Sequence, residues 1–487
     1  MTIDSFFLGG LVAASFMCVA AVVFFERKNP ASSIAWVLLL IFLPGLGFLA
    51  YLFLGSGFRI SKKKKYALKA INDALYDKFL RQRLNIADAI KFMQSHENAA
   101  RLMNYLKNEG EGPYTCDNRA EVFTFGSAMF PRLIEDIENA QSHIHLLYFI
   151  FRNDEIGREI AAVLTDKARR GVEVRLIYDS VGARAVFSPP LFRNLRRAGG
   201  RVLGFAPVFS NINSPLRLNY RNHRKITVID GRIGYVGGMN IGDEYMSRDK
   251  KLRPWRDTHL RLTGSAVGFL QERFLMDWGY ASDDMEPREP VNLGKFFPGP
   301  RPGEQGTLGA QIVSSGPDTS ESPIKSGLLA LIYAARRNVY IQTPYFTPDK
   351  SLMDALRVAA RADIDVRLML PNISDHRLAH LATLGYARQA LEAGVRVFLY
   401  NGFLHAKTVV SDRLITSIGT TNLTNRSFTL DFEINAFIYD QGFAADYEDI
   451  FLEDLANAAE ITLKWFTEKK ALANAGYNFA RLFAPLM

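Results

Sequence analysis

The chain has 487 residues, 48% of them hydrophobic, with 35 Phe and 19 Tyr, so it is long enough for two or three domains with substantial cores and is not mainly disordered. A formal net charge of +9 suits a protein that works near anions, whether nucleic acid, anionic lipid or phosphate substrates, and charge alone does not choose among them. Only Cys18 and Cys116 are present, which excludes a disulfide framework and a cysteine-based metal cluster.

Two long apolar segments open the chain. Phe6 to Phe25 is a run of twenty residues without a charge, which as a helix would span the roughly 30 Å of a bilayer core. Ile34 to Phe53 contains twenty more, interrupted by a Pro-Gly pair and a further Gly. We expect a membrane anchor over residues 1–60 with two transmembrane segments (about 6–25 and 34–53), or one span followed by a re-entrant hairpin.

A cleaved signal peptide is the alternative reading of the first apolar run. The residues before it include Asp4 but no Lys or Arg, the run is too long, and no convincing small-residue cleavage site follows. Membrane helices therefore remain the prediction for this region.

Basic residues follow the second apolar segment. Arg59 to Tyr66 reads "RISKKKKY", whereas the short connection between the apolar segments carries only Arg27 and Lys28 against Glu26. The positive-inside rule then predicts that both termini and everything after residue 60 lie in the cytoplasm. Lysines next to a membrane would also bind anionic head groups. Residues 61–118 are expected to form a juxtamembrane helical connector, because most of this stretch lacks Pro and Gly.

The rest of the chain contains an internal repeat. Each half reads strand, helix, strand, then a short helix and strand, at these positions: 142–151, 157–171, 172–179 and 199–205 in the first half, and 337–346, 352–362, 365–371 and 394–400 in the second. This alternation predicts an α/β fold of two pseudo-symmetric lobes, each a mixed sheet with helices on both faces. We place the lobes at residues 119–290 and 307–487, with a linker rich in Pro and Gly at 291–306.

Each half then contains a copy of the same sequence motif: "NHRKITVIDGRIGYVGGMN" begins at Asn222 and "LHAKTVVSDRLITSIGTTN" begins at Leu404. The retained residues are His223, Lys225, Asp230 and Asn240 in the first copy, and His405, Lys407, Asp412 and Asn422 in the second. In a strand, residues two apart lie on one face, so each His and Lys should lie side by side. Two imidazoles, two ammonium groups and two amides suit a phosphate group, with the imidazoles as nucleophile and acid. No acidic metal cage is present, so we expect metal-independent catalysis without a cofactor.

Each histidine also has a candidate orienting carboxylate later in its own copy. Asp257 lies 34 residues after His223, and Glu433 lies 28 residues after His405, both in strand-like contexts. A carboxylate that accepts the Nδ1 proton fixes the tautomer, leaves Nε2 to attack, and stabilises the imidazolium. An ordinary salt bridge is the structural alternative for both residues.

These motifs resemble the phospholipase D superfamily, whose signature is two copies of HxKxxxxD followed by GxxN. The apolar N-terminus, "QTPYFTP" from Gln342 and "TTNLTNRSF" from Thr420 extend the resemblance over the full length to bacterial cardiolipin synthases of the two-span type. One difference between the copies is Gly237-Gly238 in the first where the second has Gly419-Thr420, and both forms occur in the family.

The resemblance implies a multi-pass enzyme of the bacterial cytoplasmic (inner) membrane, with its catalytic lobes facing the cytoplasm. It would make cardiolipin and glycerol from two phosphatidylglycerol molecules through a phosphohistidine intermediate. His223 would be the nucleophile and His405 the acid and base. The catalytic set would also include both lysines and both aspartates of the motifs, while the two asparagines bind phosphate. Anionic membrane lipid is the expected partner, nucleic acid is not, and a homo-oligomer stays open.

Other activities use the same chemistry. A phospholipase D would use water as the acceptor and a phosphatidylserine synthase would use serine, and membrane anchoring favours an acceptor that is itself in the membrane. Some superfamily members are nucleases, but this chain has both motif copies and two apolar segments, and it shows no basic stretch rich in aromatic residues. A non-catalytic scaffold would have decayed motifs, whereas both are intact here.

Overall fold

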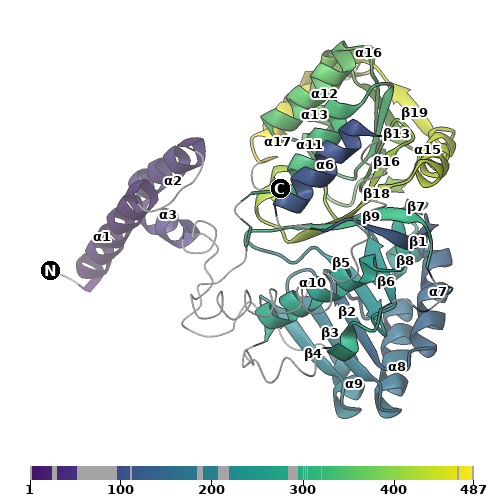
Figure 1. Ribbon diagram of the computed structural model, residues 1–487. Helices are drawn as coiled ribbons and strands as arrows, with labels where there is room; N and C mark the ends of the chain where they lie inside the picture. Colours follow the sequence, from purple (N-terminus) through teal and green to yellow (C-terminus); the bar gives the residue numbers. More distant parts are fainter. Residues whose placement is uncertain are drawn as a thin grey trace.

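The computed structural model describes residues 3–24, 30–51, 96–109, 112–183, 190–206, 219–282, 294–299, 301, 303, 305–319, 321–468 and 471–484. The predicted lysine run lies outside the described residues, as do residues 291–293, 300, 302 and 304 of the predicted linker. Two lobes lie one above the other in Figure 1, and three N-terminal helices lie to one side of them.

A mixed sheet of fifteen strands runs through both lobes in the order β19-β13-β12-β10-β15-β16-β18-β9-β1-β8-β6-β5-β2-β3-β4. The lobes meet where β1 pairs with β9 in antiparallel fashion. From this joint outward the strand order is β1-β8-β6-β5-β2-β3-β4 on one side and β9-β18-β16-β15-β10-β12-β13 on the other. The two halves therefore share one topology, which confirms the predicted α/β fold with a mixed sheet; β19 is an addition at one edge.

The first lobe contains β1 (Thr115–Phe123), α7 (Gly126–Glu138), β2 (His143–Tyr148), α8 (Glu155–Arg169), β3 (Glu173–Asp179), α9 (Arg193–Arg197), β4 (Arg201–Phe205), β5 (Lys225–Ile229), β6 (Ile233–Gly237), β7 (Trp255–Arg256), β8 (His259–Thr263) and α10 (Ala266–Ala281), with short 3₁₀ helices at Pro190–Phe192 and Asp243–Met246. The first four predicted elements of this half are thus present, with ends shifted by a few residues.

The second lobe contains β9 (Leu308–Ser315), α11 (Pro323–Ala334), β10 (Asn338–Gln342), β11 (Phe346–Thr347), α12 (Lys350–Arg361), β12 (Asp365–Pro371), α13 (Arg377–Ala393), β13 (Arg396–Tyr400), β14 (Phe403–Leu404), β15 (Thr408–Ser411), β16 (Ile415–Gly419), β17 (Leu423–Thr424), α14 (Asn425–Thr429), β18 (Glu433–Tyr439), α15 (Gln441–Leu455), β19 (Ala458–Ile461), α16 (Leu463–Thr467) and α17 (Ala471–Arg481). The order of β10, α12, β12 and β13 repeats that of β2, α8, β3 and β4, as the sequence repeat predicts.

Local sequence explains where the main helices begin. Asp154, Asp349 and Asp440 each precede a helix, and each side chain accepts a hydrogen bond from a backbone N–H in the first turn, at α8, α12 and α15 respectively. The strands between them are short and fully buried, as in β2, because helices cover both faces of the sheet. Leu270 of α10 and Phe451 of α15 belong to a core that runs through both lobes.

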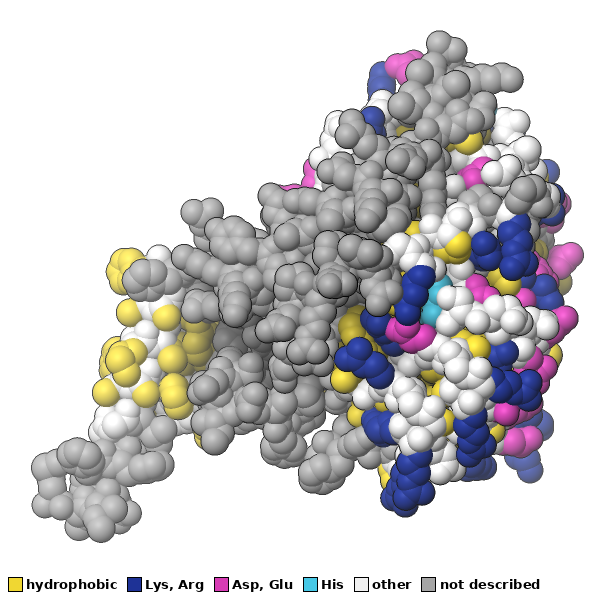
Figure 2. Space-filling model, turned by 60° about the horizontal axis from the view of Figure 1, so that its bottom comes forward, with side chains coloured by type: hydrophobic (Ala, Val, Ile, Leu, Met, Phe, Trp, Pro, Cys, Tyr) yellow, Lys and Arg dark blue, Asp and Glu magenta, His cyan; other side chains and the backbone are white. Residues whose placement is uncertain are grey.

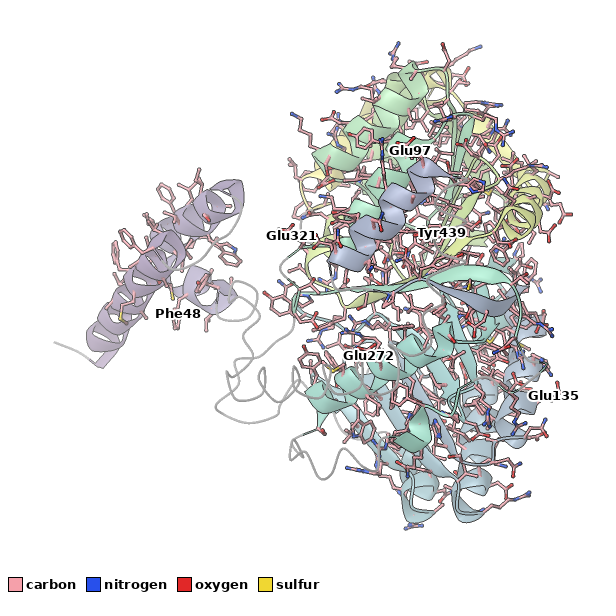
Figure 3. The ribbon with its side chains drawn as sticks, in the orientation of Figure 1. Phe48, Glu97, Glu135, Glu272, Glu321 and Tyr439 are labelled. Atoms are coloured by element: carbon pink, nitrogen blue, oxygen red, sulfur yellow. The ribbon has the colours of Figure 1, made fainter. Side chains whose placement is uncertain are left out.

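The helix α6 (Glu97–Asn108) belongs to the second lobe, although the sequence places it in the predicted connector. Leu102 and Leu106 pack into the core of that lobe together with α11, and Gln311 of β9 donates a hydrogen bond of 2.6 Å to the carbonyl of Gly112 just beyond the helix. Figure 1 shows the dark-blue α6 lying on the upper lobe, and Figure 3 labels Glu97 on it. The segment before β1 is thus partly a covering helix rather than only a spacer.

The N-terminal helices are α1 (Ile3–Phe24), α2 (Pro30–Phe42) and α3 (Pro44–Ala50), which pack on one another. The second predicted span is broken at Leu43, because a residue before proline is disfavoured in the α conformation. Within the described part of the chain, none of the helices has the length and apolarity required to cross a bilayer. Figure 2 shows apolar side chains gathered on the surface of these helices and many Lys and Arg side chains on the lower lobe.

Candidate active site

The two motif copies form equivalent β-hairpins, one in each lobe. In the first, Lys225 opens β5 and the chain returns in β6, with Ile226 opposite Val236. In the second, β15 and β16 pair in the same way, with Thr408 opposite Ile418. Each histidine lies two residues before its lysine, just ahead of the strand proper. Each catalytic side chain is therefore positioned at the end of a buried strand, which restricts its movement.

Short parallel bridges between the lobes bring the histidines together. The backbone N–H of His223 donates to the carbonyl of Phe432 at 2.9 Å, and the N–H of His405 donates to the carbonyl of Arg256 at 2.6 Å. The second bridge continues as the β7–β14 pair. In each case the accepting residue directly precedes a buried carboxylate of the other lobe, so each histidine lies beside that carboxylate.

The predicted carboxylates orient the histidines, but the pairing is crossed. His223 Nδ1 lies 3.0 Å from Glu433 Oε2, and His405 Nδ1 lies 2.6 Å from Asp257 Oδ2. The expectation that each carboxylate serves the histidine of its own copy is wrong, because the interlobe bridges place each histidine against the opposite lobe. The residue types and their role as Nδ1 partners agree with the sequence argument. With Nδ1 engaged, Nε2 is the ring nitrogen left for chemistry.

The difference between Gly238 and Thr420 now has a structural reason. Thr420 Oγ1 donates to Glu433 Oε2 at 2.5 Å, so the second copy uses a hydroxyl to hold its carboxylate. A Cβ at Gly238 would lie 2.0 Å from Asp257 Oδ1, so the first copy needs glycine there to make room for its carboxylate. The two copies thus support their carboxylates by different means.

Both histidines line one cavity of about 910 Å³ between the lobes. Asn240 and Asn422 also line it, as predicted, together with apolar and charged side chains. Aromatic rings flank the histidines: Phe149 lies 5.1 Å from the His223 ring and Trp255 lies 5.3 Å from the His405 ring. Further lining residues come from both lobes: Arg152, Asp243, Glu244, Tyr245, Arg248, Tyr345, Asp375, Leu378, Arg426 and Asp431. The cavity is large enough for a bulky diester and has both apolar and polar walls.

The two lysines lie beneath the histidines. Lys225 Nζ donates to the carbonyl of His223 at 2.5 Å, and Lys407 Nζ makes the equivalent bond to His405. Burial lowers the pKa of Lys225 to about 7 and that of Lys407 to about 8, although nearby carboxylates, including Glu433 and Asp257, oppose the shift. Glu433 and Asp257 thus only partly offset the cost of burying these cations, and a bound phosphodiester would add further negative charge beside them.

The titration of the histidines and their carboxylates follows from the same burial. Burial, together with the nearby lysines, lowers the pKa of His405 to about 4 and lowers that of His223 well below its usual value. Burial raises the pKa of Glu433 to about 7. For Asp257 burial acts in the same direction, but His405, Lys407 and a backbone N–H outweigh it and lower the pKa. The Asp257–His405 pair therefore has the more firmly ionised carboxylate, which favours His405 as the site of the proton.

The two asparagines differ in their surroundings. Asn240 Oδ1 accepts from the N–H of Ile150 at 3.0 Å, and its Nδ2 donates to Tyr245 Oη at 2.6 Å. Asn422 Oδ1 finds no hydrogen-bond partner in the described part of the chain. The amide of Asn240 is thus held in place by the protein, and Tyr245, which sequence reasoning missed, offers its hydroxyl to the cavity.

The motif aspartates lie at the far end of the hairpins. The carboxylate of Asp230 accepts the backbone N–H groups of Gln141, Ser142 and His143 at 2.7–3.0 Å. Asp412 accepts those of Arg336, Arg337 and Asn338 at 2.8–3.0 Å. Both aspartates have positive φ at the hairpin turn. They fasten the start of β2 and β10 to the hairpin and are not among the residues that line the cavity, so a structural role explains their contacts and their place in the catalytic set stays a prediction.

Two buried arginines were also missed. Arg224 donates to the carbonyl of Glu433 at 3.0 Å and to Asp277 at 2.6 Å. Arg256 donates to the carbonyl of Asp257 and pairs with Asp454 at 2.8 Å. The backbone of each catalytic carboxylate is therefore held by an arginine. Both arginines adjoin predicted site residues in the sequence, but no spacing rule connects them to the partners that they contact.

Among the described residues no group of three or more His, Cys, Asp or Glu side chains is arranged to hold a metal ion.

Residues 133–252 and 328–455 match the family described as "Cardiolipin synthase, PLD-like domain", and residues 13–56 match the family described as "Phospholipase_D-nuclease N-terminal". The chain is 40% identical to a cardiolipin synthase of Staphylococcus aureus (strain Mu50) over all of this chain and 97% of the relative. It is also 40% identical to the major cardiolipin synthase ClsA of Bacillus subtilis (strain 168), over the full length of both.

A solved structure, the phosphatidylserine synthase of Haemophilus influenzae Rd KW20, superimposes with a TM-score of 0.60 at 15% identity, over 80% of this chain and all of that one. At this identity the likeness concerns the fold alone, and it agrees with the arrangement of two similar lobes described above.

Proposed function

Because the chain belongs to the family of cardiolipin synthases with phospholipase D-like domains, we propose that its cavity joins two phosphatidylglycerol molecules into cardiolipin and releases glycerol. The chain is a cardiolipin synthase, a phosphatidyltransferase that acts on phospholipid. The observation that supports the mechanism is the pair of histidines in one cavity, each bound through Nδ1 to a carboxylate of the other lobe.

In the first half-reaction, His223 Nε2 attacks the phosphorus of one phosphatidylglycerol. The bond from phosphorus to the head-group glycerol oxygen breaks, and that oxygen takes a proton from Nε2 of His405. Diacylglycerol stays attached through its phosphate to His223. Asp257 supports His405 in the protonated state that this step requires, and the negative charge of the bound diester raises the pKa of His405 from its low value in the empty site.

In the second half-reaction, His405 is neutral and accepts the proton of a glycerol hydroxyl on another phosphatidylglycerol. The hydroxyl oxygen attacks phosphorus, the phosphorus–nitrogen bond breaks, and His223 is restored. Cardiolipin leaves, and His405 again carries the proton for the next cycle. Both histidines end the cycle in the protonation states in which they began it, and no adduct remains on the protein. Two phosphatidylglycerols therefore give one cardiolipin and one glycerol.

The assignment of His223 as nucleophile rests on the two carboxylates. The lowered pKa of Asp257 keeps a full negative charge beside His405, which stabilises a proton there. Glu433, with a pKa of about 7, is a weaker stabiliser of a protonated His223. A histidine that stays neutral keeps its Nε2 lone pair available for attack.

Lys225 and Lys407 supply the positive charge for the phosphoryl oxygens in both half-reactions. The amide of Asn422 and the hydroxyl of Tyr245, which Asn240 holds, are the hydrogen-bonding groups on either side of the cavity. These groups interact more strongly with the charge that develops on the nonbridging oxygens than with the ground-state diester.

The N-terminal region is proposed as the membrane anchor, with two transmembrane segments and the lobes in the cytoplasm. Large apolar side chains are exposed there, among them Met17 at 68%, Phe24 at 77% and Phe42 at 75%. The match of residues 13–56 to an N-terminal family of this superfamily supports the same role. Accessibility of single introduced cysteines at residues 2, 28 and 60 to an impermeant reagent, in intact cells and in inverted vesicles, tests this topology.

Product analysis with purified protein tests the proposed function. Vesicles of phosphatidylglycerol alone should yield cardiolipin and glycerol in equal amounts, whereas a phospholipase D would yield phosphatidic acid, and a phosphatidylserine synthase would require serine. His223→Ala and His405→Ala should abolish both products, and His96→Ala, which removes a histidine of α6's N-terminal end, should not. Cardiolipin formation by either cavity variant at a normal rate would contradict the proposal.

A further inference from the structure

The helix α17 presents three large apolar side chains to the surface at its C-terminal end. Phe479 is 60% exposed, Leu482 is 73% exposed and Phe483 is 36% exposed. Leu482 and Phe483 follow Phe479 by three and four residues, so the three side chains lie on one side of the helix. Beyond Arg481 the helical turn continues, because the N–H of Leu482 donates to the carbonyl of Phe479 and the N–H of Phe483 donates to that of Ala480. We call these three residues the C-terminal apolar patch.

The opposite side of this helix is fixed to the second lobe. Tyr477, Ala480 and Ala484 are buried, and α17 packs along α13. The backbone of Tyr477 and the side chain of Arg481 lie against Gly385 in the middle of α13. The patch is therefore held outward by a packed helix, and Phe479 and Phe483 contact each other with ring centroids 5.2 Å apart.

The patch lies close to the mouth of the catalytic cavity. His376, Leu378 and Ala379, at the start of α13, line that cavity. Seven residues separate Leu378 from Gly385, which is about 10 Å along a helix. Leu378 is itself 42% exposed, so the helix on which α17 packs also carries an exposed apolar side chain at the cavity.

Basic charge accompanies this apolar surface. Arg377 is exposed next to Leu378 and forms no ion pair with any residue that the structure describes. Lys464 of α16 has a side chain that is 81% exposed, with Glu468 3.7 Å away as a solvent-exposed partner. An apolar stripe beside basic side chains is the combination that binds the interface of an anionic bilayer, with rings and aliphatic chains among the acyl chains and cations at the phosphates.

We propose that the C-terminal apolar patch inserts into the surface of an anionic lipid bilayer beside the cavity mouth. The inference rests on the proposed function, because a lipid substrate has to pass from the bilayer into the cavity. Contact at this place brings the cavity mouth to the level of the lipid head groups, so that a phosphatidylglycerol enters without leaving the membrane entirely. The patch acts in addition to the N-terminal helices.

Spin labelling tests the contact directly. In full-length protein with Cys18→Ser and Cys116→Ser, a nitroxide is attached to Phe479→Cys or Leu482→Cys after reconstitution in phosphatidylglycerol vesicles. We expect both labels to collide more often with oxygen, which concentrates in the bilayer, than with a water-soluble nickel chelate. A label at Val358→Cys, a 50% exposed apolar position on α12, should show the reverse preference.

A functional measurement complements the labels. Phe479→Asp combined with Leu482→Asp should lower transfer from vesicles at least about tenfold, since burying one such side chain is worth this factor or more. Transfer from short-chain phosphatidylglycerol dissolved as monomers should be unchanged, which shows that the variant is folded. Val358→Asp should alter neither activity.

Two results would overturn the proposal. Labels on the patch that resemble the one at position 358 would show that the patch lies in water. Labels shielded from both reagents would show that protein, from this chain or a second copy, covers it. If unaltered protein made no cardiolipin while the labels still reported insertion, the proposed function would fail and the membrane contact would stand.

Discussion

Nδ1 of His405 lies 2.6 Å from Oδ2 of Asp257, a carboxylate that belongs to the other lobe. The reciprocal contact joins His223 to Glu433 at 3.0 Å. Neither motif copy therefore contains a complete catalytic unit, because each supplies an imidazole to one pair and a carboxylate to the other. The duplication is required for the chemistry and for the support of each histidine.

The crossed pairing predicts which variants should behave alike. His405 protonates the leaving glycerol, so its loss should matter little when the leaving group is p-nitrophenol, which needs no proton. With phosphatidyl-p-nitrophenol we expect His405→Ala and Asp257→Asn to release one equivalent of nitrophenol at near-normal rates. His223→Ala should abolish this release of nitrophenol. Glu433→Gln should lower its rate by about a hundredfold or more.

The comparison of variants tests the pairing whichever of the two histidines is the nucleophile. The carboxylate variant that resembles His405→Ala has to be the one that contacts it. If Glu433→Gln instead of Asp257→Asn behaved like His405→Ala, the crossed arrangement would be wrong.

The lysines predict a pH dependence of substrate capture. In the empty protein burial lowers the pKa of Lys225 to about 7 and that of Lys407 to about 8, so both lose their charge as the pH rises through this range. We expect the fall of kcat/KM with pH, which reports the free enzyme and already begins with the lowered pKa of His405, to become steeper between pH 7 and 9. The bound diester raises both pKa values again, so kcat should hold to a higher pH. A kcat/KM whose fall does not become steeper up to pH 9 would argue against buried lysines of lowered pKa.

The same burial predicts a conflict between stability and function. An unfolded lysine keeps its pKa near 10.5, so the unfolded chain binds more protons than the folded one between pH 7 and 10.5, and the stability of the empty protein rises with pH in this range. Lys225→Met removes the buried ammonium. At pH 7 the variant should melt at least about 2 °C higher, since 1 kcal/mol shifts the Tm of a domain of this size by about 2–4 °C, and it should be inactive.

Lys464→Met is the matched control for this measurement, because its side chain is 81% exposed and carries no comparable cost of burial. Its Tm should stay within experimental scatter of the unaltered protein. A lower Tm for Lys225→Met would mean that the contacts of its ammonium outweigh the cost of its burial.

The motif aspartates should affect folding more than chemistry. Asp230→Ala removes the acceptor for three backbone N–H groups, and that of His143, at the buried start of β2, would cost about 1–3 kcal/mol if left without a partner. We expect a clear drop in Tm by calorimetry and retained activity per folded molecule at low temperature. Asp412→Ala should do the same, whereas Asp449→Ala, at a side chain that is 59% exposed, should leave both the Tm and the activity unchanged. Normal stability with lost activity would place the aspartates in the catalytic set.

Local patterns predicted most of the fold. The apolar runs around β2, β3, β10 and β12 predicted strands correctly, because a strand that is buried on both faces has a nearly continuous apolar sequence. The role of α6 was not predictable in this way, since its apolar face shows that it packs against something but not that Leu102 meets the second lobe. The break at Leu43 follows a rule that applies to any residue before proline, yet membrane helices tolerate exceptions to it.

Residue types were predicted better than partners. The histidines, lysines and carboxylates of the site follow from two repeated motifs. The crossing of Asp257 and Glu433 depends on interlobe bridges, and spacing along one chain carries no information about how two similar lobes face each other. The structural contacts of Asp230 could not be predicted for a related reason: it lies at the opposite end of the strand from Lys225, and its distance in the motif reflects the length of a hairpin.

The central claim is that one imidazole from each lobe completes a double displacement, with His223 as the nucleophile. The most direct measurement is mass spectrometry of the acid-labile adduct: protein is mixed with phosphatidylglycerol, quenched at neutral or alkaline pH within one turnover, digested and sequenced. Asp257→Asn, with Asn457→Asp as a surface control, tests whether the adduct depends on the His405 pair. We predict a phosphatidyl group on the peptide that contains His223 and none on the peptide that contains His405. An adduct on His405, or cardiolipin formed without any covalent intermediate, would contradict the account.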